Sequence, residues 1–326
     1  MFPKLFQIPF TNLTVWTYGV LMVIGFISAI ALIRRLSRDI TPDPQYITNA
    51  ALYSLIAGIA GARLFYVVHY FDTFRHNLLS VFAIWEGGLE LLGGVILAIT
   101  VIILYLRYHK LPALQYLDIL AIALLLALGF GRIGCFMRGC CFGKPANPDM
   151  PWAVCFPYGS PAFLSQIQPD PKRNREDILI KLPDEFFGYT DADGKQYSGL
   201  KPFEYLTEQQ QKMATKGIYR ALPVHPTQLY SAANGFLSCF LLYLFWRRSK
   251  KTANIAKLFT KPGSSFAMML ILYAIARFTV EFIRDDNPIG FAGLTISQRM
   301  CLFGLIPIGI ALIIIFHKLP RKKTQY

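Results

Sequence analysis

The chain has 326 residues, of which 54% are hydrophobic and only 16% are charged. Soluble domains carry about 25% charged residues, so this deficit, together with several apolar runs of about 20 residues, excludes a soluble globular protein. The net charge of +14 would suggest nucleic acid in a soluble protein, but here the lysines and arginines cluster at the ends of apolar runs. Such clustering is typical of membrane topology signals. We therefore predict an all-α integral membrane protein whose surroundings are the lipid bilayer, with no nucleic-acid partner.

Seven apolar runs predict seven membrane helices, and polar residues set their boundaries. Asp43-Pro44 has the pattern of a helix N-cap followed by proline at the first helical position. Thr295-Ile296-Ser297-Gln298 has the spacing of a capping box. No basic segment precedes the first run and no small-residue cleavage site follows it, so we expect it to remain as a membrane helix. The predicted spans are about Val15–Leu32, Pro44–Tyr70, Leu89–Lys110, Ala113 into the stretch Gly131–Pro145, Pro226–Arg248, Phe266–Ile283 and Thr295–His317.

The loops between these runs differ in charge. Basic residues follow the first, third, fifth and seventh spans, whereas the short loops on the other side hold few, Arg75 being the clear case. The positive-inside rule then places the N-terminus outside and the C-terminus in the cytoplasm. The one long loop lies outside as a small extracytoplasmic cap. The chain therefore divides into helices 1–4 (1–141), the cap (142–224), and helices 5–7 with a basic tail (225–326).

Charged groups inside membrane spans are costly and point to function. Arg63 lies in the second span, and Arg132 lies at the end of the fourth. The sixth span carries a polar stripe, because its polar residues fall within about 80° of arc on a helix. This stripe consists of Tyr273, Arg277, Glu281 and Arg284.

Two interpretations of the stripe stay open. In the first, Glu281 forms an internal ion pair with Arg277 or Arg284 that only holds helices together. In the second, the excess positive charge, with Arg132 on the same side of the membrane, binds an anion. The planar fork of arginine suits a phosphate, and the abundant anion at this depth is a phospholipid headgroup. The second interpretation predicts an outward-facing phospholipid site.

The segment Gly131–Pro145 combines an arginine, several glycines and three cysteines at the end of a span. Its glycines allow the backbone to bend and to approach a ligand closely. If the outer compartment is oxidising, cysteines on this side form disulfides, so we expect a structural disulfide first and a reactive thiol second. Metal binding ranks last, because no histidine lies within ligand spacing and no Cys-x2-Cys pair is present. The cysteines concerned are Cys135, Cys140, Cys141 and Cys155.

Three further features give weaker signals. Tyr18 fits an interfacial aromatic belt. His225 opens a motif that contains Gln228 and fits a helix start with proline at its first position, where a histidine is more often a structural hydrogen-bonder than a catalyst. The glycine pairs between 87 and 94 predict either a re-entrant turn or close helix packing.

Together and in order, these residues resemble the prolipoprotein diacylglyceryl transferase family over nearly the whole chain. The resemblance implies a seven-span enzyme of the bacterial cytoplasmic (inner) membrane. Its expected partners are phosphatidylglycerol, which donates a diacylglyceryl group, and an exported prolipoprotein, whose lipobox cysteine thiol accepts it. The expected products are a thioether and glycerol phosphate. The segments that carry the resemblance are Tyr18-Gly19, Gly61-Ala62-Arg63-Leu64, Trp85-Glu86-Gly87-Gly88, Gly131-Arg132-Ile133-Gly134, His225-Pro226-Thr227-Gln228-Leu229-Tyr230, and Arg277 through Glu281 to Arg284.

The resemblance also implies roles for individual residues. The family's essential arginines match Arg132 and Arg277, which would hold the lipid phosphate and stabilise it as the leaving group. The nucleophile belongs to the substrate, so we expect neither a cofactor nor a metal. The catalytic candidates are Arg132, Arg277, Tyr18 and Glu281, and the substrate-binding candidates are Arg132, Arg277, Arg284, Tyr273, Gly143, His225 and Gln228.

Several positions depart from the family pattern. Cys135 replaces an asparagine, Cys140 replaces a glutamate, and Ser231 replaces a residue that is usually glutamate. The family's histidine, a candidate general base, falls on Leu92, and Glu90 would point elsewhere on a helix. The thiol-activating half of the site is therefore altered. This leaves open a divergent phospholipid-dependent transferase with another acceptor or a cysteine-based step, and a non-catalytic phospholipid-binding membrane protein.

Overall fold

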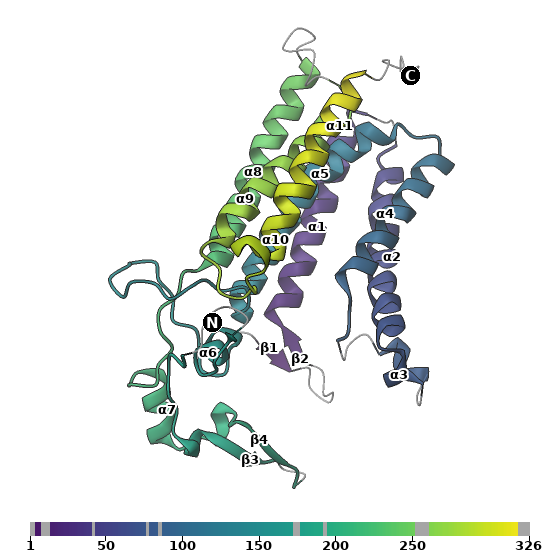
Figure 1. Ribbon diagram of the computed structural model, residues 1–326. Coiled ribbons are helices and arrows are strands. Elements are labelled where there is room, and N and C mark those ends of the chain that lie inside the picture. The colour runs from purple at the N-terminus through teal and green to yellow at the C-terminus, as the bar shows by residue number, and fades with distance from the viewer. Residues whose placement is uncertain are drawn as a thin grey trace.

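Long helices make up most of the described chain (Figure 1). Six of the described helices are long and apolar enough to cross a membrane, so the protein is a multi-pass, mostly helical membrane protein. The computed structural model describes residues 4–7, 14–40, 43–75, 78–83, 87–171, 177–191, 194–251 and 261–318.

Each predicted span corresponds to a helix. The third, α4, is not among the six, because its described apolar part, Gly93–Tyr108, is shorter. The seventh consists of a short α10 (Ile296–Arg299), a π-helical turn (Met300–Leu305) and α11 (Ile306–Lys318), and the predicted capping box at its start is confirmed. The other long helices are α1 (Thr17–Ser37), α2 (Gln45–His69), α4 (Leu91–Tyr108), α5 (Ala113–Arg138), α8 (Thr227–Lys251) and α9 (Ser264–Glu281).

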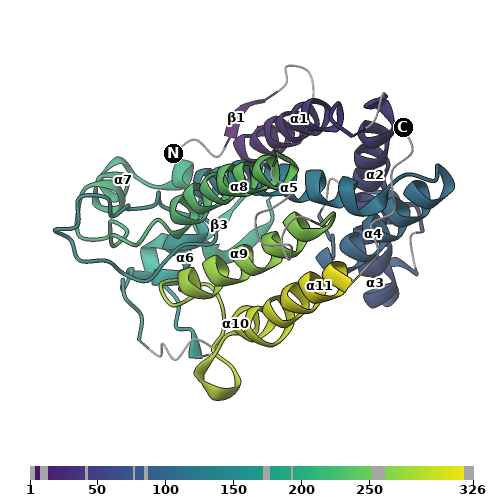
Figure 2. The ribbon, with the colours of Figure 1, turned by 90° about the horizontal axis from the view of Figure 1, so that it is seen from above.

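Helix α5 lies at the centre of the bundle. It packs against α1, α8 and α9, while α2 and α4 pack together beside it, as Figure 2 shows from above. Its apolar face is fully buried at Ile119 and Ile122. In the α2–α4 pair, a Cβ on Gly61 would lie 2.5 Å from the carbonyl oxygen of Gly93. The close-packing interpretation of the glycine pairs is therefore confirmed for the second pair.

A buried aspartate ties the start of α9 to α5. The carboxylate of Asp118, 5% exposed, accepts hydrogen bonds from the backbone N–H of Gly263 at 2.8 Å and of Phe266 at 2.9 Å. These N–H groups have no partner inside their own helix, and the positive end of the helix dipole favours the carboxylate charge. Asp118 therefore caps a helix that follows it by 145 residues.

Arg63 proves to be an anchor for the loop before α4. Its guanidinium, in a residue that is 7% exposed, donates to the carbonyl oxygens of Ser80, Val81, Gly87 and Gly88 at 2.6–3.0 Å. Four backbone acceptors occupy four of the five N–H donors of this side chain, so the intramembrane charge at this position has a structural role.

The cap lies at one end of the bundle, opposite the end of α11 (Figure 1). Its own apolar core includes Phe163, Ile180 and Phe186. Its elements are α6 (Pro161–Gln166), α7 (Glu208–Thr215) and the antiparallel pair β3 (Phe187–Thr190) and β4 (Gln196–Leu200). The remaining short elements are the antiparallel pair β1 (Lys4–Gln7) and β2 (Thr14–Trp16), which leads into α1, and α3 (Phe71–Phe74) after α2.

Candidate functional site

The cap-side ends of α5, α8 and α9 are joined by backbone hydrogen bonds. Gly143 N–H donates to the His225 carbonyl oxygen at 3.0 Å, and His225 N–H donates to the Lys144 oxygen at 3.1 Å. On the other side, Lys144 N–H donates to the Ile283 oxygen at 2.8 Å. The segment after α5 thus runs between the start of α8 and the end of α9. Residues far apart in the sequence are brought to one place by this junction.

Gly143 and His225 act in this junction through their backbones. A Cβ on Gly143 would lie 2.6 Å from the His225 carbonyl oxygen and 2.9 Å from Cγ2 of Thr227, so no larger residue fits. The imidazole Nδ1 of His225 lies 3.4 Å from the Tyr230 hydroxyl. This contact joins the His225 side chain to the first turn of α8.

The first turn of α8 holds the cysteine-rich turn that follows α5. The Thr227 hydroxyl donates to the Cys141 carbonyl oxygen at 2.7 Å, and the Gln228 amide donates to the Cys140 carbonyl oxygen at 2.7 Å. Both side chains belong to residues that are at most 1% exposed. Gln228 therefore contacts the cysteine-rich turn through the backbone of Cys140. Thr227 was not singled out from the sequence, because nothing in the linear motif distinguishes its hydroxyl from an ordinary helix-start residue.

Glu281 is the centre of a buried polar cluster. Its carboxylate forms an ion pair with Arg277, accepts hydrogen bonds from Thr295 at 2.7 Å and Asn287 at 2.6 Å, and lies 3.7 Å from Nε of Arg284. The residue is 3% exposed, and a carboxylate is stable at such burial only with partners of this kind. The internal ion pair is therefore present, with both arginines.

Arg284 lies three residues beyond the end of α9 and is paired with Asp286. Its Nε and Nη2 donate to the two carboxylate oxygens of Asp286 at 2.7 and 2.5 Å. Burial alone would lower the pKa of Arg284, but the hydrogen bonds and charge of Asp286 outweigh burial and raise it. This guanidinium is bound by two carboxylates, a partnership that the stripe alone did not indicate because Asp286 lies outside it.

Arg132 and Arg277 line the same small cavity, about 30 Å³, together with Tyr273, Ser231 and Asn234. The three helices α5, α8 and α9 contribute these side chains. Arg132 has no hydrogen-bond or ion-pair partner among the described residues, whereas Arg277 has Glu281 and donates to Ser297 at 3.0 Å. Arg132 therefore brings an uncompensated positive charge to a cavity wall.

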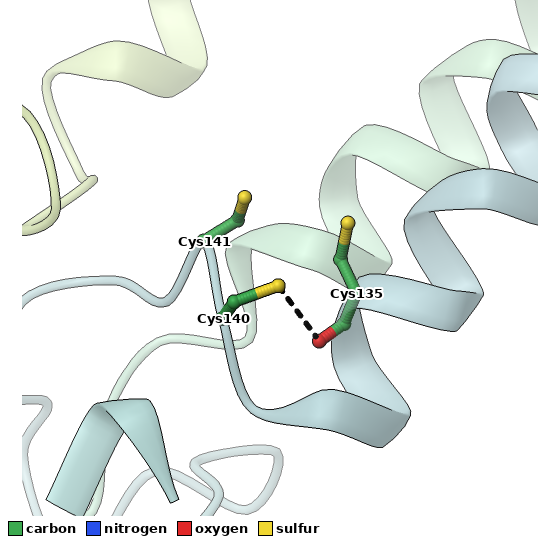
Figure 3. Close-up of side chains that lie close together, drawn as sticks. All are labelled: Cys135, Cys140 and Cys141. Carbon is green, nitrogen blue, oxygen red and sulfur yellow. Dashed lines mark hydrogen bonds between the residues drawn. The ribbon is translucent and has the colours of Figure 1, made fainter. Parts of the chain in front are cut away.

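Three of the predicted cysteines form a cluster at the end of α5 (Figure 3). The sulfur atoms of Cys135, Cys140 and Cys141 all lie within 4.8 Å of one another, and all three are free thiols. Figure 3 shows the Cys135 and Cys141 thiols on the same side, with Cys140 between them and donating to the Cys135 carbonyl oxygen at 3.7 Å. Cys155 is a free thiol outside this cluster and packs against the cap core near Phe163.

The cysteine cluster lies in a positive environment. The neighbouring Cys135 and Cys140 thiols, and then the charges of Arg284 and Arg132, hold the pKa of the Cys141 thiol below its ordinary value. Cys141 therefore lies within electrostatic range of Arg284, which belongs to the polar stripe, and of Arg132, which lies at the end of the fourth predicted span.

Tyr18 packs against the same end of α5. A Cβ on Gly134 would lie 2.9 Å from the ring of Tyr18, and the phenol is within electrostatic range of Cys135 and Cys140. Nearby, a larger hollow of about 280 Å³ is lined by Trp16 and by residues of the cap, including Tyr158. Tyr18 thus packs beside the end of α5, and the hollow lies between that end of α5 and the cap.

The segment that should carry the family's histidine is only partly described. Trp85 and Glu86 lie outside the described residues. The carboxylate of Glu90 lies 3.5 Å from Nδ1 of His69, so it is directed to α2.

The fold and the site define a class: a multi-pass membrane protein with arginines, a buried carboxylate and thiols gathered at one end of its bundle. The model of the family described as prolipoprotein diacylglyceryl transferase matches residues 3–315. The chain therefore belongs to the prolipoprotein diacylglyceryl transferase family.

The chain is similar to curated relatives over 93–99% of its length. A protein of Buchnera aphidicola subsp. Acyrthosiphon pisum is 31% identical, with 99% of each chain covered. A protein of Burkholderia orbicola is 30% identical over 93% of this chain and 90% of its own length. A protein of Clostridium tetani is 26% identical over 95% of this chain and 96% of its own length. Each is named a phosphatidylglycerol–prolipoprotein diacylglyceryl transferase.

Proposed function

We propose that this protein transfers the diacylglyceryl group of phosphatidylglycerol to the lipobox cysteine of a prolipoprotein, with Arg132 as the primary phosphate ligand. The observation that carries this assignment is the cavity shared by Arg132 and Arg277, in which Arg132 has no counter-ion among the described residues. A guanidinium without a counter-ion near the membrane surface is costly unless it meets an anion. The phosphate of the lipid headgroup supplies that anion.

In the proposed reaction, the acceptor thiolate attacks C3 of the donor's glycerol. A sulfur–carbon bond forms, the carbon–oxygen bond to phosphate breaks, and its electron pair stays on the oxygen of the departing glycerol phosphate. Arg132 binds this phosphate and stabilises the charge that grows on it. Arg277 is held in place by Glu281 and Ser297, so it offers its charge without having to be ordered first. Arg284, bound by Asp286, positions Glu281.

We further propose that the protein lies in the bacterial cytoplasmic membrane with its cap outside, and that α4 also crosses the membrane, which makes seven spans in all. The predicted basic loops follow α1, α4, α8 and α11, the ends opposite the cap. Phosphatidylglycerol of the outer leaflet and an exported prolipoprotein meet on the cap side in this orientation.

A second candidate keeps the lipid donor and changes the acceptor. It is favoured by Cys135, Cys140 and Leu92, which replace the polar residues of the family pattern. In this case the arginines act as above, and a different thiol or hydroxyl receives the lipid.

The test is a reconstituted assay with phosphatidylglycerol vesicles and a lipobox peptide, read by mass spectrometry of the peptide. We expect the thioether product from the wild type, and a rate lower by about 100-fold or more in Arg132→Ala, because one charged ligand of the leaving group is lost. Arg220→Ala, an exposed cap arginine, is the matched control and should keep the wild-type rate.

Turnover that survives both Arg132→Ala and Arg277→Ala would contradict the phosphate assignment. An inserted protein that consumes phosphatidylglycerol but leaves the peptide unmodified would favour the second candidate. Expression in a strain depleted of its own transferase gives an independent readout, because only diacylglyceryl transfer to prolipoproteins restores growth.

A further inference from the structure

A turn after α5 brings the thiols of Cys135, Cys140 and Cys141 together, and buried side chains at the start of α8 hold this turn in place. Gly139 ends α5 in the left-handed conformation, with φ of 78°, and reverses the chain. Cys141 also has a positive φ, 60°, which is uncommon for a residue other than glycine. The Thr227 and Gln228 side chains bind the two carbonyl oxygens of Cys141 and Cys140 and keep the turn in this form. A strained backbone held by buried partners is a reason to look for a function.

We propose that Cys135, Cys140 and Cys141 bind a zinc ion and leave its fourth coordination position open to the acceptor thiol. Zinc–thiolate bonds are about 2.3 Å long, which puts the sulfurs of a tetrahedral site about 3.8 Å apart. The three sulfurs already lie within 4.8 Å of one another, so each pair has to approach by at most about 1 Å. Small side-chain rotations achieve this without moving the backbone.

The surrounding charges favour such a site. Three thiolates and one Zn²⁺ carry a net charge of about −1, which rises to about −2 when a further thiolate binds. Arg132, which has no ion-pair partner among the described residues, lies within electrostatic range of Cys141 and supplies positive charge, whereas the charge of Arg284 is already shared with Asp286. The cluster is partly buried, and a negative centre at this position is stabilised by its cationic neighbours.

The position of the cluster suits the proposed reaction, on which the role of the open position rests. Cys135 follows Arg132 by three residues on α5, so the two side chains lie on the same face of the helix, about one turn apart. The acceptor thiol would release its proton to solvent on binding zinc, because a zinc-bound thiol is deprotonated. Arg132, the proposed phosphate ligand, lies about one helical turn from Cys135. Zinc would thereby activate the acceptor thiol, which Leu92 cannot do in place of the family's histidine.

The cysteine spacing that argued against a metal site in the sequence does not keep these thiols apart in the folded chain. Cys-x4-Cys-Cys is not a common zinc motif, but the turn at Gly139 removes the distance that the spacing implies. A disulfide is the competing outcome. Adjacent Cys140 and Cys141 are poorly suited to pair with each other, because neighbouring Cα atoms are about 3.8 Å apart and disulfides need about 4.4 Å or more.

The experiment measures metal in the full-length protein, purified without chelators through a tag free of histidine and cysteine. Elemental mass spectrometry should find about one zinc per chain. Cys135→Ser, Cys140→Ser and Cys141→Ser should each lower this to background. Cys155→Ser, which removes a cysteine outside the cluster, should retain the metal.

A second measurement uses the wild type, so it does not depend on whether the variants fold. Zinc is exchanged for Co²⁺, and absorption from sulfur-to-cobalt charge transfer is recorded. We expect this absorption to increase when a lipobox peptide is added and to stay constant with the same peptide carrying serine for cysteine.

Wild-type protein without zinc, or with an intact mass that shows a disulfide within the cluster, would overturn the proposal. Equal zinc in all three serine variants would do the same. These readouts need no turnover. Zinc-free protein that still makes the thioether refutes only this proposal, whereas zinc-loaded protein that makes no thioether refutes the proposed reaction and leaves the metal site standing.

Discussion

Arg132 and Arg277 reach the same cavity from α5 and α9, yet their surroundings differ. Arg277 is paired with Glu281, and Glu281 also lies near Arg284. Arg132 has no such partner among the described residues. At the residue scale, the site therefore contains one guanidinium ready for an anion and a second held in a network. Residues of the network set position, and removing one of them leaves a buried charge without compensation.

Replacement of Glu281 by glutamine tests this network. Glu281→Gln keeps the shape but removes the charge between Arg277 and Arg284, so we expect the free energy of unfolding to fall by about 3 kcal/mol. Thermal unfolding in detergent measures the change. The control is Glu185→Gln, at an exposed cap position. Unchanged stability in Glu281→Gln would mean that the ion pair does not hold α9 to its neighbours.

At Gly143, the addition of a single methyl group should have a large effect on both transferase rate and stability. In Gly143→Ala the new methyl would meet the His225 carbonyl oxygen at 2.6 Å, so the segment after α5 must move away from α8. We expect at least a tenfold loss of transferase rate and a destabilisation of about 2 kcal/mol. Gly199→Ala, where a Cβ meets nothing within 4 Å, is the matched control. Equal behaviour of the two variants would contradict the role given to the junction.

At the scale of elements, polar side chains rather than loops fix how the helices meet. Asp118 binds the start of α9 to α5, and Arg63 binds the loop before α4 to α2. Both partners are backbone groups that lack hydrogen bonds inside their own elements. Polar contacts of this kind also lock the register between helices, which apolar packing alone does not specify in a membrane.

Loss of the Asp118 carboxylate should free the start of α9. We expect Asp118→Ala to lower the free energy of unfolding by about 3 kcal/mol, because two charge-assisted hydrogen bonds are lost and the N–H groups stay buried. Asp118→Asn keeps one acceptor oxygen and should lose about half as much. Thermal unfolding and hydrogen exchange across 261–267 are the measurements, with exposed Asp149→Ala as control. If hydrogen exchange became faster only outside α9, this would contradict the assignment of Asp118 as the residue that caps the N-terminus of α9.

Arg63 should prove structural. In Arg63→Lys a single ammonium group replaces a fork that meets four carbonyl oxygens, so the loop should open even though the charge is kept. We expect faster proteolysis and faster hydrogen exchange within 78–90, with phosphatidylglycerol binding by Arg132 retained. A variant that loses lipid binding while this loop stays protected would place Arg63 in the site.

At the scale of the whole molecule, the site, the cap and the hollow between them all lie at one end of the bundle, and the basic helix ends lie at the other. In the proposed function, this polarity separates the end that handles substrates from the end that carries the basic residues. The central helix α5 joins the two ends, because Asp118 lies near its start and Arg132 and Cys135 lie near its end.

The orientation can be measured with reporters. A fluorescent protein fused after residue 326 should fluoresce, because it folds in the cytoplasm, whereas alkaline phosphatase inserted at Gly194 in the cap should be active, because it folds outside. The reciprocal fusions serve as controls and should be silent. The opposite pattern would contradict the proposed topology and with it the outward-facing site.

The sequence by itself determined the membrane helices and the residues of the stripe. Apolar runs with polar ends can be recognised directly in the sequence, and the spacing of Arg277 and Glu281 places them on one helical face. The capping box at Thr295 is likewise a local pattern and is confirmed. Each of these features depends on residues that are close together in the sequence, so the sequence alone determines them.

The tertiary structure alone decided which groups meet. Asp118 and Gly263 are 145 residues apart, and no local pattern links them. The sequence could not tell that Arg284 is held by Asp286 while Arg132 has no ion-pair partner among the described residues, because ion pairing depends on side-chain positions in space. The three clustered thiols are a further case, since two left-handed residues bring them together. Charges and ligands act over a few ångströms, and those distances are fixed only when distant segments have packed.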